Sequence, residues 1–384
     1  MTITGNAGDW SEMYVFLKLL SDRILRRADE NLEPKSGICY EIRKIIRKEN
    51  ADTIDYVVND KEGTIDIVSK GNTLARFKFE RFTEEANYLF GEVRAVKGGT
   101  YSFDRTEKFM DDIHCAKLKA PSKDKTDINM VAYDSEIREE TSLGFSIKSY
   151  VKGAPTLLNA STSTNLIFEI DGMNNDDMKF VNGLVKATNT VFGGNAKEKI
   201  DIAGRMKFLR DKGYTLRYIG TESKTFRNNM MMTDADIPVI VGAMLIEFYM
   251  NGISNVTDLI EAVAKKNPLG HDIPDRRSYY SHKVKRFLTD IATGMVPDTD
   301  WTGTEKANGG YIIVKESWEV VCYHIYHRND FEDYLMHNTC LDKPSAPRHH
   351  YISIDNTVDG KYRIKLNLQI RFKKAKSGHT LRKC

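Results

Sequence analysis

The chain has 384 residues, about 2.6 times the ~150 residues of a typical domain, so its length predicts two domains or one large elaborated domain. Its 41% hydrophobic, 10% aromatic and 29% charged residues exclude the disordered and fibrous classes. The longest uncharged apolar run, residues 237–246, is shorter than the ~20 residues that cross a bilayer. The amino terminus also lacks the basic start and apolar middle of a secretory signal, so we expect a cytoplasmic protein with no membrane partner.

Charge and cysteine content say little about partners. The 57 basic and 54 acidic residues leave a net charge of +3, too small to indicate nucleic-acid binding from composition alone. The charge is uneven, because residues 361–384 hold nine Lys and Arg and no acid, which predicts a basic tail with non-specific attraction to phosphate. The five cysteines are scattered and form no CxxC pair, so we expect reduced thiols rather than a disulfide framework or a zinc site.

The pattern of apolar residues predicts a mixed α+β chain. An amphipathic helix is expected at 10–25, followed by short antiparallel strands within 54–79 and further strands at 126–133, 143–149 and 165–170. Helical periodicity then dominates, with helices expected at 177–191, 197–211, 236–250, 254–265 and 278–293. Strands return at 311–315, 320–326 and 361–372, the last with strict apolar and polar alternation.

The two strands expected around residues 126–149 bring chemically useful side chains together. Asp127 opens the first strand, while Ser146 and Lys148 stand on one face of the second, because strand side chains repeat every two residues. A carboxylate holding a divalent metal beside a lysine ammonium is what phosphodiester hydrolysis needs, since the metal activates water and the ammonium assists the nucleophile. The spacing Asp-x18-Ser-x-Lys alone is also typical of an ordinary solvated strand face.

This segment resembles the PD-(D/E)XK nuclease core, and longer phrases resemble the HpaII family of type II restriction endonucleases. The phrases span roughly residues 5–372 and are GDWSEMYVFLKLL, GFSIKSYVKGAPTLLNAS followed by TNLIFEI, NNMMMTDADIP, YYSHKVKRFL, ATGMVP and KLNLQIRF. The resemblance implies a restriction-endonuclease-like core with additional helical and antiparallel β elements. It also implies a Mg²⁺-dependent endonuclease that cuts double-stranded DNA at the palindrome CCGG, with a cognate DNA methyltransferase in the same cell that is not a physical partner.

The resemblance assigns two catalytic residues and leaves one metal ligand open. Asp127 matches the metal-binding acid of the nuclease motif and Lys148 matches its lysine, whereas Ser146 stands where an acid is expected. Another carboxylate must replace that ligand. Glu169 is one candidate, because it lies on a following strand and faces away from the apolar side, and Glu12 in the first helix is the other.

Two further groups are candidates for DNA contacts. The polar run 159–165 offers hydroxyl and amide groups that suit phosphate oxygens, and its candidate residues are Asn159, Ser161, Thr162 and Asn165. The helix expected at 278–293 carries a basic face next to an apolar stripe, and its candidates are Arg277, Lys283 and Arg286. Both patterns are also common on ordinary polar surfaces.

The sequence thus predicts a nuclease region at 1–195 and a helical and antiparallel β region for DNA contact and recognition at 196–384, ending in the basic tail. Two rival interpretations stay open: a DNA-binding protein whose nuclease site has decayed at Ser146, and a nuclease of another specificity. A palindromic target is compatible with a homodimer and with sequential nicking by a monomer. Base-reading residues do not follow from the sequence.

Overall fold

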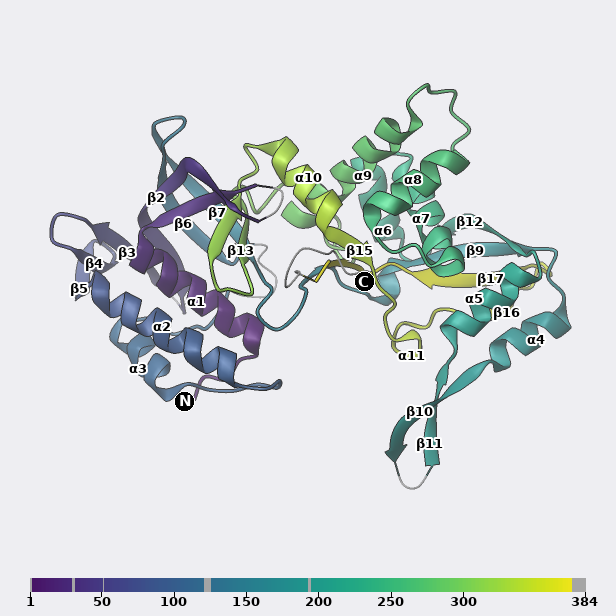
Figure 1. Cartoon of the computed structure of the whole chain (residues 1–384), viewed down its shortest axis with the longest axis horizontal. Helices are drawn as coiled ribbons and strands as arrows, with labels where there is room; N and C mark the ends of the chain where they lie inside the picture. The colour runs from purple at the N-terminus through teal and green to yellow at the C-terminus, as the bar shows by residue number, and fades with distance from the viewer. Residues whose placement is uncertain (1, 30–31, 51, 121–125, 193–194, 375–384) are drawn as a thin grey trace.

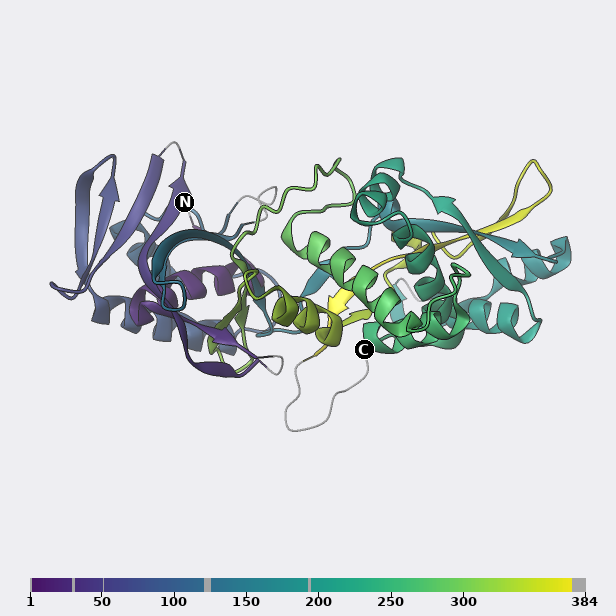
Figure 2. The same cartoon turned by 90° about the horizontal axis from the view of Figure 1, so that it is seen from above.

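The molecule is elongated and has two lobes joined side by side (Figures 1 and 2). The computed structural model describes residues 2–29, 32–50, 52–120, 126–192 and 195–374. We call the part with the large sheet and the first three helices the first lobe, and the part with the remaining helices and smaller sheets the second lobe. The mixture of helices and strands confirms the predicted α+β class.

The first lobe is built on a nine-stranded sheet. In spatial order its strands are β1 (Ile24–Ala28), β14 (Val320–Tyr323), β13 (Gly310–Val314), β7 (Glu139–Ser149), β6 (Ile128–Asp134), β2 (Pro34–Glu49), β3 (Asp52–Asn59), β4 (Thr64–Ser69) and β5 (Asn72–Lys78). The pairs β1–β14 and β13–β7 are parallel, and the other neighbours are antiparallel. Because the long strand β2 also pairs with β1, this part of the sheet curls back on itself.

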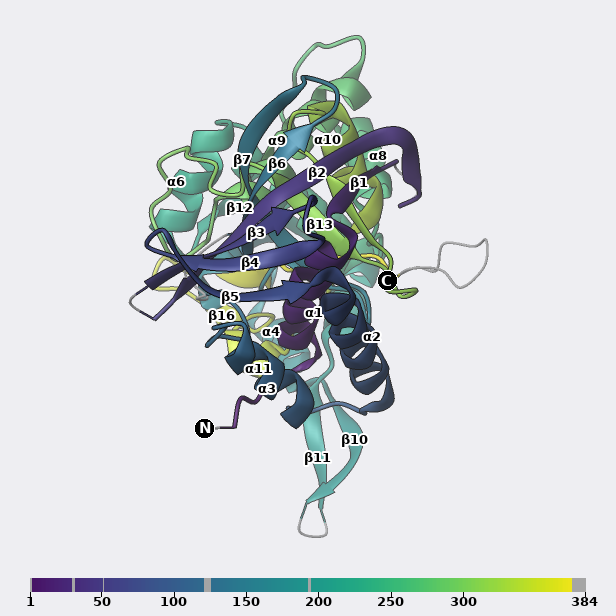
Figure 3. The same ribbon diagram turned by 90° about the vertical axis from the view of Figure 1, so that its left-hand side faces the viewer.

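Three helices cover the first lobe: α1 (Ala7–Asp22), α2 (Phe79–Ala95) and α3 (Asp104–Asp112). Figure 3 shows α1 and α2 side by side. The α1 helix begins at Asn6, whose side chain accepts hydrogen bonds from the first turn while Asp9 bonds back to the Asn6 N–H, forming a capping box. It ends at Arg23, which adopts a left-handed conformation, and its apolar side chains are buried against the sheet and α2.

The second lobe combines helices with three small sheets. One sheet has the order β12 (Thr215–Thr221), β9 (Asn165–Asp171), β17 (Tyr362–Asn367), β16 (Ile354–Asn356); another is β15 (Thr339–Leu341), β18 (Ile370–Phe372), β8 (Thr156–Leu158); the third is the hairpin β10 (Val185–Phe192), β11 (Asn195–Ile200). The helices are η1 (Thr162–Thr164), α4 (Asn175–Gly183), α5 (Ile202–Asp211), α6 (Lys224–Thr233), α7 (Ile237–Asn251), α8 (Val256–Lys266), α9 (Arg276–Thr293), α10 (Arg328–Asn338) and α11 (Ala346–His349). The apolar α7 lies in the core, with α8 and α9 packed against it.

Most predicted elements are confirmed, and two helices are corrected. Helix α4 stops at Gly183 and the chain continues as strand β10, while the helix expected at 197–211 begins only at Ile202 because β11 precedes it. The alternating run at 361–372 forms two strands in different sheets, since β17 joins β9 and β18 joins β8.

The sheets do not follow the predicted boundary at residue 195. The late strand β13 lies in the first lobe beside β7 (Figure 1), and β14 pairs with β13 on its other side, whereas β8 and β9 belong to second-lobe sheets. Alternate residues of β13 enter the two cores: Ile312 and Val314 pack with α1 to α3, whereas Tyr311 and Ile313 pack with the second lobe. These strands are therefore shared between the lobes.

Two expectations from composition can be compared with the described residues. None of the described helices is long and apolar enough to cross a membrane. Cys39, Cys115 and Cys322 are free thiols, whereas Cys340 is disulfide-bonded, so the expectation of reduced thiols throughout is corrected.

Candidate active site

Asp127 lies just before β6, where the β6–β7 hairpin fixes its backbone and its side chain. Its backbone N–H donates to the carbonyl of Phe145 at 2.8 Å. Its Oδ2 accepts hydrogen bonds from the Ser146 hydroxyl at 3.0 Å and from the Ile147 N–H at 2.6 Å. The carboxylate is thus held rigidly through Oδ2, and neither of these bonds uses Oδ1.

Ser146 makes a hydrogen bond to Asp127 at the position where the nuclease motif has an acid. It is 7% exposed and its hydroxyl donates to Asp127, so it orients the carboxylate that the sequence identified. A second acid at this position would place two carboxylates within hydrogen-bond distance, where one would need a proton or a cation.

Glu12 lies in α1 and supplies a second carboxyl group to the same place. Its Oε2 is buried and has no hydrogen-bond partner among the described residues. Burial, together with the nearby charges of Asp127 and Asp9, raises the pKa of Glu12 to about 8. The charge of Asp127 is among the causes of this shift, so the two carboxyl groups are close enough for their charges to interact.

Lys148 completes the group from β7. It makes no hydrogen bond or ion pair with the described residues, and its ammonium lies 5.2 Å from the centre of the Tyr311 ring. Burial lowers the pKa of Lys148, while the charges of Asp127 and Glu12 act in the opposite direction. Asp127, Glu12 and Lys148 are therefore brought together, with Ser146 bonded to the first of them.

The α1 helix is tied to β7 beside these groups. The Ser149 hydroxyl donates to the Ser11 hydroxyl at 2.9 Å, and Ser11 in turn donates to the carbonyl of Ala7 at 2.7 Å. Ser11 precedes Glu12 and Ser149 follows Lys148. This bond therefore fixes the distance between helix α1 and strand β7, which carry the two site residues. Sequence reasoning missed this link, since a pair of serines carries no distinctive signal.

Glu169, the other candidate for the replacement ligand, lies elsewhere. It is in β9 of the second lobe, where it forms ion pairs with Arg217 and, at 2.8 Å, with Lys361. The hydrogen bond from Lys361 and these positive charges lower its pKa. The structure does not bring Glu169 to Asp127, so the two candidates are separated by geometry.

The polar run 159–165 contains exposed and buried members. Asn159 and Thr162 are exposed, whereas Ser161 and Thr164 cap the short helix η1. Asn165 is completely buried, and its amide donates to Glu222 at 2.7 Å and to the carbonyl of His349 at 2.8 Å. The expectation that Asn165 contacts DNA is therefore corrected, because its buried side chain bonds to the segment after β12 and to α11 inside the second lobe.

The basic residues of α9 are largely neutralised within the protein. Arg277 pairs with Glu261, and Lys283 pairs with Asp234 at 2.5 Å and Asp236 at 3.1 Å. Lys283 is only 12% exposed, so it holds α9 against the loop between α6 and α7 rather than presenting a free charge. The Nε of Arg286 is buried and has no hydrogen-bond partner among the described residues. Arg277 nevertheless stays largely exposed, so a DNA contact by this helix remains a prediction for Arg277, whereas Lys283 is held in ion pairs.

A cavity opens between the lobes next to the end of β7. Its volume is about 590 Å³, and its lining includes Ala7, Gly8, Ser149 and Lys152 from the first lobe and Arg371 from the second. The lining residue nearest in sequence to the site is Ser149, which follows Lys148, whereas Asp127, Glu12 and Lys148 do not line this cavity.

The described residues contain no group of three or more His, Cys, Asp or Glu that could bind a metal. The donor set beside Lys148 is instead a pair of carboxylates. Mg²⁺ suits such a set, because it is usually held by one or two carboxylates and completes its coordination with water and substrate phosphate.

Comparison with known proteins gives the family. The family model described as HpaII restriction endonuclease matches residues 6–372. The chain belongs to the HpaII restriction endonuclease family. Type II restriction enzyme HpaII from Haemophilus parainfluenzae is 36% identical over 370 residues, which cover 96% of this chain and 98% of that enzyme. No solved structure matches the chain.

Membership of the HpaII family confirms the resemblance drawn from the sequence phrases and makes the chain a type II restriction endonuclease acting on double-stranded DNA. The match extends through both lobes, including α1 and the β6–β7 hairpin. Type II restriction enzymes generally use a divalent metal, which agrees with the pair of carboxylates.

Proposed function

We propose that this endonuclease hydrolyses DNA within CCGG, using Mg²⁺ held by Asp127 and Glu12 with Lys148 beside the attacking water. The observation that carries the proposal is the convergence of these three side chains from a hairpin and a distant helix. The proposed target sequence rests on the 36% identity to the Haemophilus parainfluenzae enzyme and on the family match, which continues through the second lobe. The β6–β7 hairpin with its Asp127, Ser146 and Lys148 would then be the PD-(D/E)XK core in a Ser-x-Lys form.

The state of Glu12 supports a cation at this place. The Glu12 carboxyl has a buried oxygen without a hydrogen-bond partner among the described residues, and it lies near the charge of a second carboxylate, Asp127. The ionised form of Glu12 is therefore unfavourable unless a metal ion compensates its charge, and otherwise the group keeps a proton. When bound, Mg²⁺ would acidify its water and offset negative charge growing on the phosphate. Glu12 would supply the ligand that Ser146 cannot.

The remaining residues would orient and stabilise. Ser146 and the Ile147 N–H hold Oδ2 of Asp127, so the carboxylate need not reorganise when substrate binds. The ammonium of Lys148 would donate a hydrogen bond to the nucleophile and stabilise the negative charge of the transition state. Because burial lowers its pKa, Lys148 is also a candidate for moving a proton.

The second lobe would position the duplex. Asn159 and Thr162 are the exposed members of the polar run, and we propose that these two contact phosphate oxygens. Two strands must be cut, either by a two-fold dimer or by one monomer acting twice, and the mass of the complex with DNA distinguishes them. Cleavage at CCGG also requires a methyltransferase that protects this sequence in the cell.

Digestion of a sequenced plasmid tests the proposal. With Mg²⁺ we expect fragments whose ends all map to CCGG, and with EDTA we expect intact plasmid. A plasmid from which every CCGG has been removed is the matched control and should remain uncut. Ends at another shared sequence would overturn the specificity, cutting in EDTA would overturn the metal dependence, and specific binding without cutting would support a decayed nuclease.

A further inference from the structure

Tyr311 lies directly beside the proposed catalytic residues, although it is distant from them in sequence. It belongs to β13, which pairs in parallel with β7 so that Tyr311 stands opposite Ser146 and Ile313 stands opposite Lys148. Paired residues of neighbouring strands share a face of the sheet, so Tyr311 is on the same side as the lysine. Its ring centre is 5.2 Å from the Lys148 ammonium, which is within the range of a cation–π contact.

The ring is the contact partner of Lys148 that the structure identifies. The lysine has no hydrogen bond or ion pair with the described residues, so no carboxylate fixes its ammonium directly. Lysine has a long flexible side chain, and an ammonium that must meet one nucleophile loses rate when it samples other rotamers. An aromatic face restricts this freedom without competing for the N–H donors that the reaction uses.

Tyr311 itself is anchored by the second lobe. It is 1% exposed, and its hydroxyl donates to the carbonyl of Ala292 in the last turn of α9 at 3.3 Å. Its ring meets the edge of Phe331 in α10 at 5.3 Å between ring centres and that of Phe372 in β18 at 6.1 Å. The residue that touches the lysine is thus held by three elements of the other lobe.

The backbone leading into Tyr311 is also tightly constrained. Gly310 has a φ of 95°, and a Cβ there would lie 2.2 Å from the carbonyl oxygen of Tyr323 on β14. Only glycine allows β13 to approach β14 so closely in this conformation. The position of the Tyr311 ring therefore follows from the main chain as well as from its neighbours.

We propose that Tyr311 is a positioning residue whose aromatic ring holds the Lys148 ammonium at the Asp127 site. This inference rests on the proposed catalytic function of Lys148. Tyr311 acts through the lysine and need not touch the substrate. The second lobe, which packs around Tyr311, would in this way help to set the position of the Lys148 ammonium in the first lobe.

Two substitutions separate the ring from the hydroxyl. Tyr311→Leu removes the aromatic face and should lower the single-turnover cleavage rate by about 10-fold or more, while DNA affinity in Ca²⁺ stays within a few-fold. Tyr311→Phe keeps the face and loses only the bond to Ala292, so it should recover most of the rate. A Tyr311→Leu rate equal to that of the wild type would overturn the inference, as would equal losses in both variants.

A matched control measures the cost of removing a core ring. Phe168 is fully buried in the second-lobe core and packs on Tyr218, away from Lys148. Phe168→Leu should reduce the free energy of unfolding while leaving the single-turnover rate of the folded fraction within a few-fold. A rate loss in Phe168→Leu as large as in Tyr311→Leu would assign the effect to general destabilisation and overturn the inference.

The coupling to lysine is tested by combining substitutions. If Tyr311 acts through Lys148, adding Tyr311→Leu to Lys148→Met should cause little further loss of rate, whereas independent effects would multiply. Multiplying effects would overturn the inference while leaving the active site standing. Wild-type rates in Lys148→Met alone would instead overturn the proposed function on which the inference rests.

Discussion

Glu12 is an acid whose surroundings oppose its ionisation. Burial and the charges of Asp127 and Asp9 raise its pKa from about 4.5 to about 8. The folded protein therefore binds this proton more tightly than the unfolded chain, so the free energy of unfolding falls as pH rises between about 4.5 and 8. This cost should be present in the metal-free protein and should disappear when a cation stabilises the carboxylate.

Replacing Glu12 with glutamine should thus stabilise the metal-free protein at alkaline pH. Glutamine cannot ionise, so in EDTA at pH 8.5 we expect Glu12→Gln to exceed the wild type in free energy of unfolding by on the order of 3 kcal/mol, allowing for partial exposure. At pH 5 both side chains are uncharged and the difference should become small. Urea unfolding at the two pH values measures it.

Mg²⁺ and Glu169 provide the controls for that experiment. Adding Mg²⁺ should narrow the difference, because the cation stabilises the ionised form of Glu12 only. Glu169→Gln should be less stable than the wild type at pH 8.5, since it loses ion pairs with Arg217 and Lys361. A Glu12→Gln protein less stable than the wild type in EDTA at pH 8.5 would contradict the electrostatic account of this site.

Catalytic assays should single out the same residues. Asp127→Asn and Lys148→Ala should each reduce cleavage by at least about 100-fold, because they remove a metal ligand and the charge beside the nucleophile, while duplex binding stays within a few-fold. Glu12→Gln should show a comparable loss and Glu169→Gln should cut normally. Single-turnover rates with a CCGG duplex measure these effects. Full activity in Glu12→Gln would show that Glu12 is not the second metal ligand.

At the scale of elements, local periodicity predicts most of the helices and strands that it was used for, whereas the pairing of distant strands has no local signal. The hairpin that holds Asp127 and Lys148 follows from strand alternation within one short segment. The choice between Glu12 and Glu169 as the second ligand depends on where α1 and β9 pack in the folded protein, and the local sequence carries no signal for it. Sequence periodicity also cannot reveal that β13 pairs in parallel with β7, so the position of Tyr311 was out of reach.

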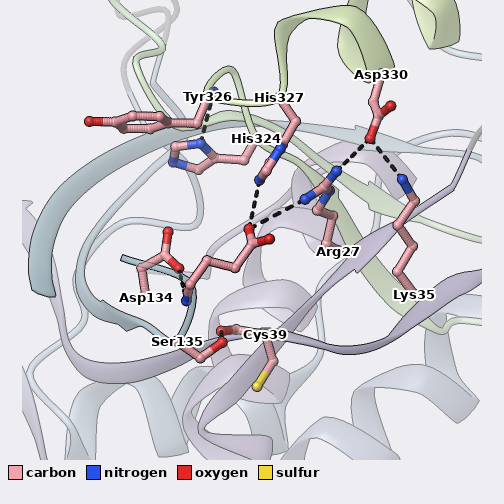
Figure 4. A network of polar contacts seen from close by, with 10 residues as sticks. Arg27, Lys35, Cys39, Asp134, Ser135, His324, Tyr326, His327 and Asp330 are labelled. Atoms are coloured by element: carbon pink, nitrogen blue, oxygen red, sulfur yellow. Dashed lines mark hydrogen bonds and ion pairs between the residues drawn. The ribbon is translucent and has the colours of Figure 1, made fainter. Parts of the chain in front are cut away.

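The turn after β14 contains a buried histidine in a polar network that links the lobes (Figure 4). The Nδ1 atom of His324 accepts a hydrogen bond from the Tyr326 N–H at 3.0 Å, and the ring is 2% exposed. Nearby, Arg27 on β1 pairs with Asp330 of α10 at 2.6 Å. Burial lowers the pKa of His324 to about 4, and protonation would place a second hydrogen against the Tyr326 N–H.

The stability of the protein should therefore fall in mild acid because of His324. Between about pH 6.5 and 4 the unfolded chain binds a proton that the folded protein resists, so the free energy of unfolding should decrease by up to about 3 kcal/mol over this window. His324→Gln should remove that part of the pH slope, because glutamine is neutral throughout. Urea unfolding from pH 7 to 4.5 measures it, with His327→Gln as the control from the exposed side of the network. An unchanged slope in His324→Gln would contradict this assignment.

At the scale of the molecule, the chain crosses between the lobes several times. It leaves the first lobe after β7, builds most of the second lobe, and returns as β13 and β14 to complete the nine-stranded sheet. The returning strands are buried on both faces, with alternate residues in the two cores. The lobes are thus not two consecutive domains, although composition and element order suggested a simple division.

Cutting the chain at the predicted boundary should consequently destroy the first lobe as an independent unit. A fragment of residues 1–195 would lack β13 and β14, leaving β7 as an unpaired edge. It would also expose the apolar side chains of β8 and β9, because their partner strands β12, β17 and β18 lie after residue 195. Unpaired edges and exposed apolar surface favour aggregation, so we expect this fragment to be insoluble or to show no cooperative urea transition. Co-expression with residues 196–384 should restore a soluble complex that co-purifies, because the second fragment carries the missing strands. A soluble monomeric 1–195 fragment that unfolds cooperatively would show that the shared strands are dispensable, and the dependence of Lys148 on Tyr311 across the lobes would then lose its structural basis.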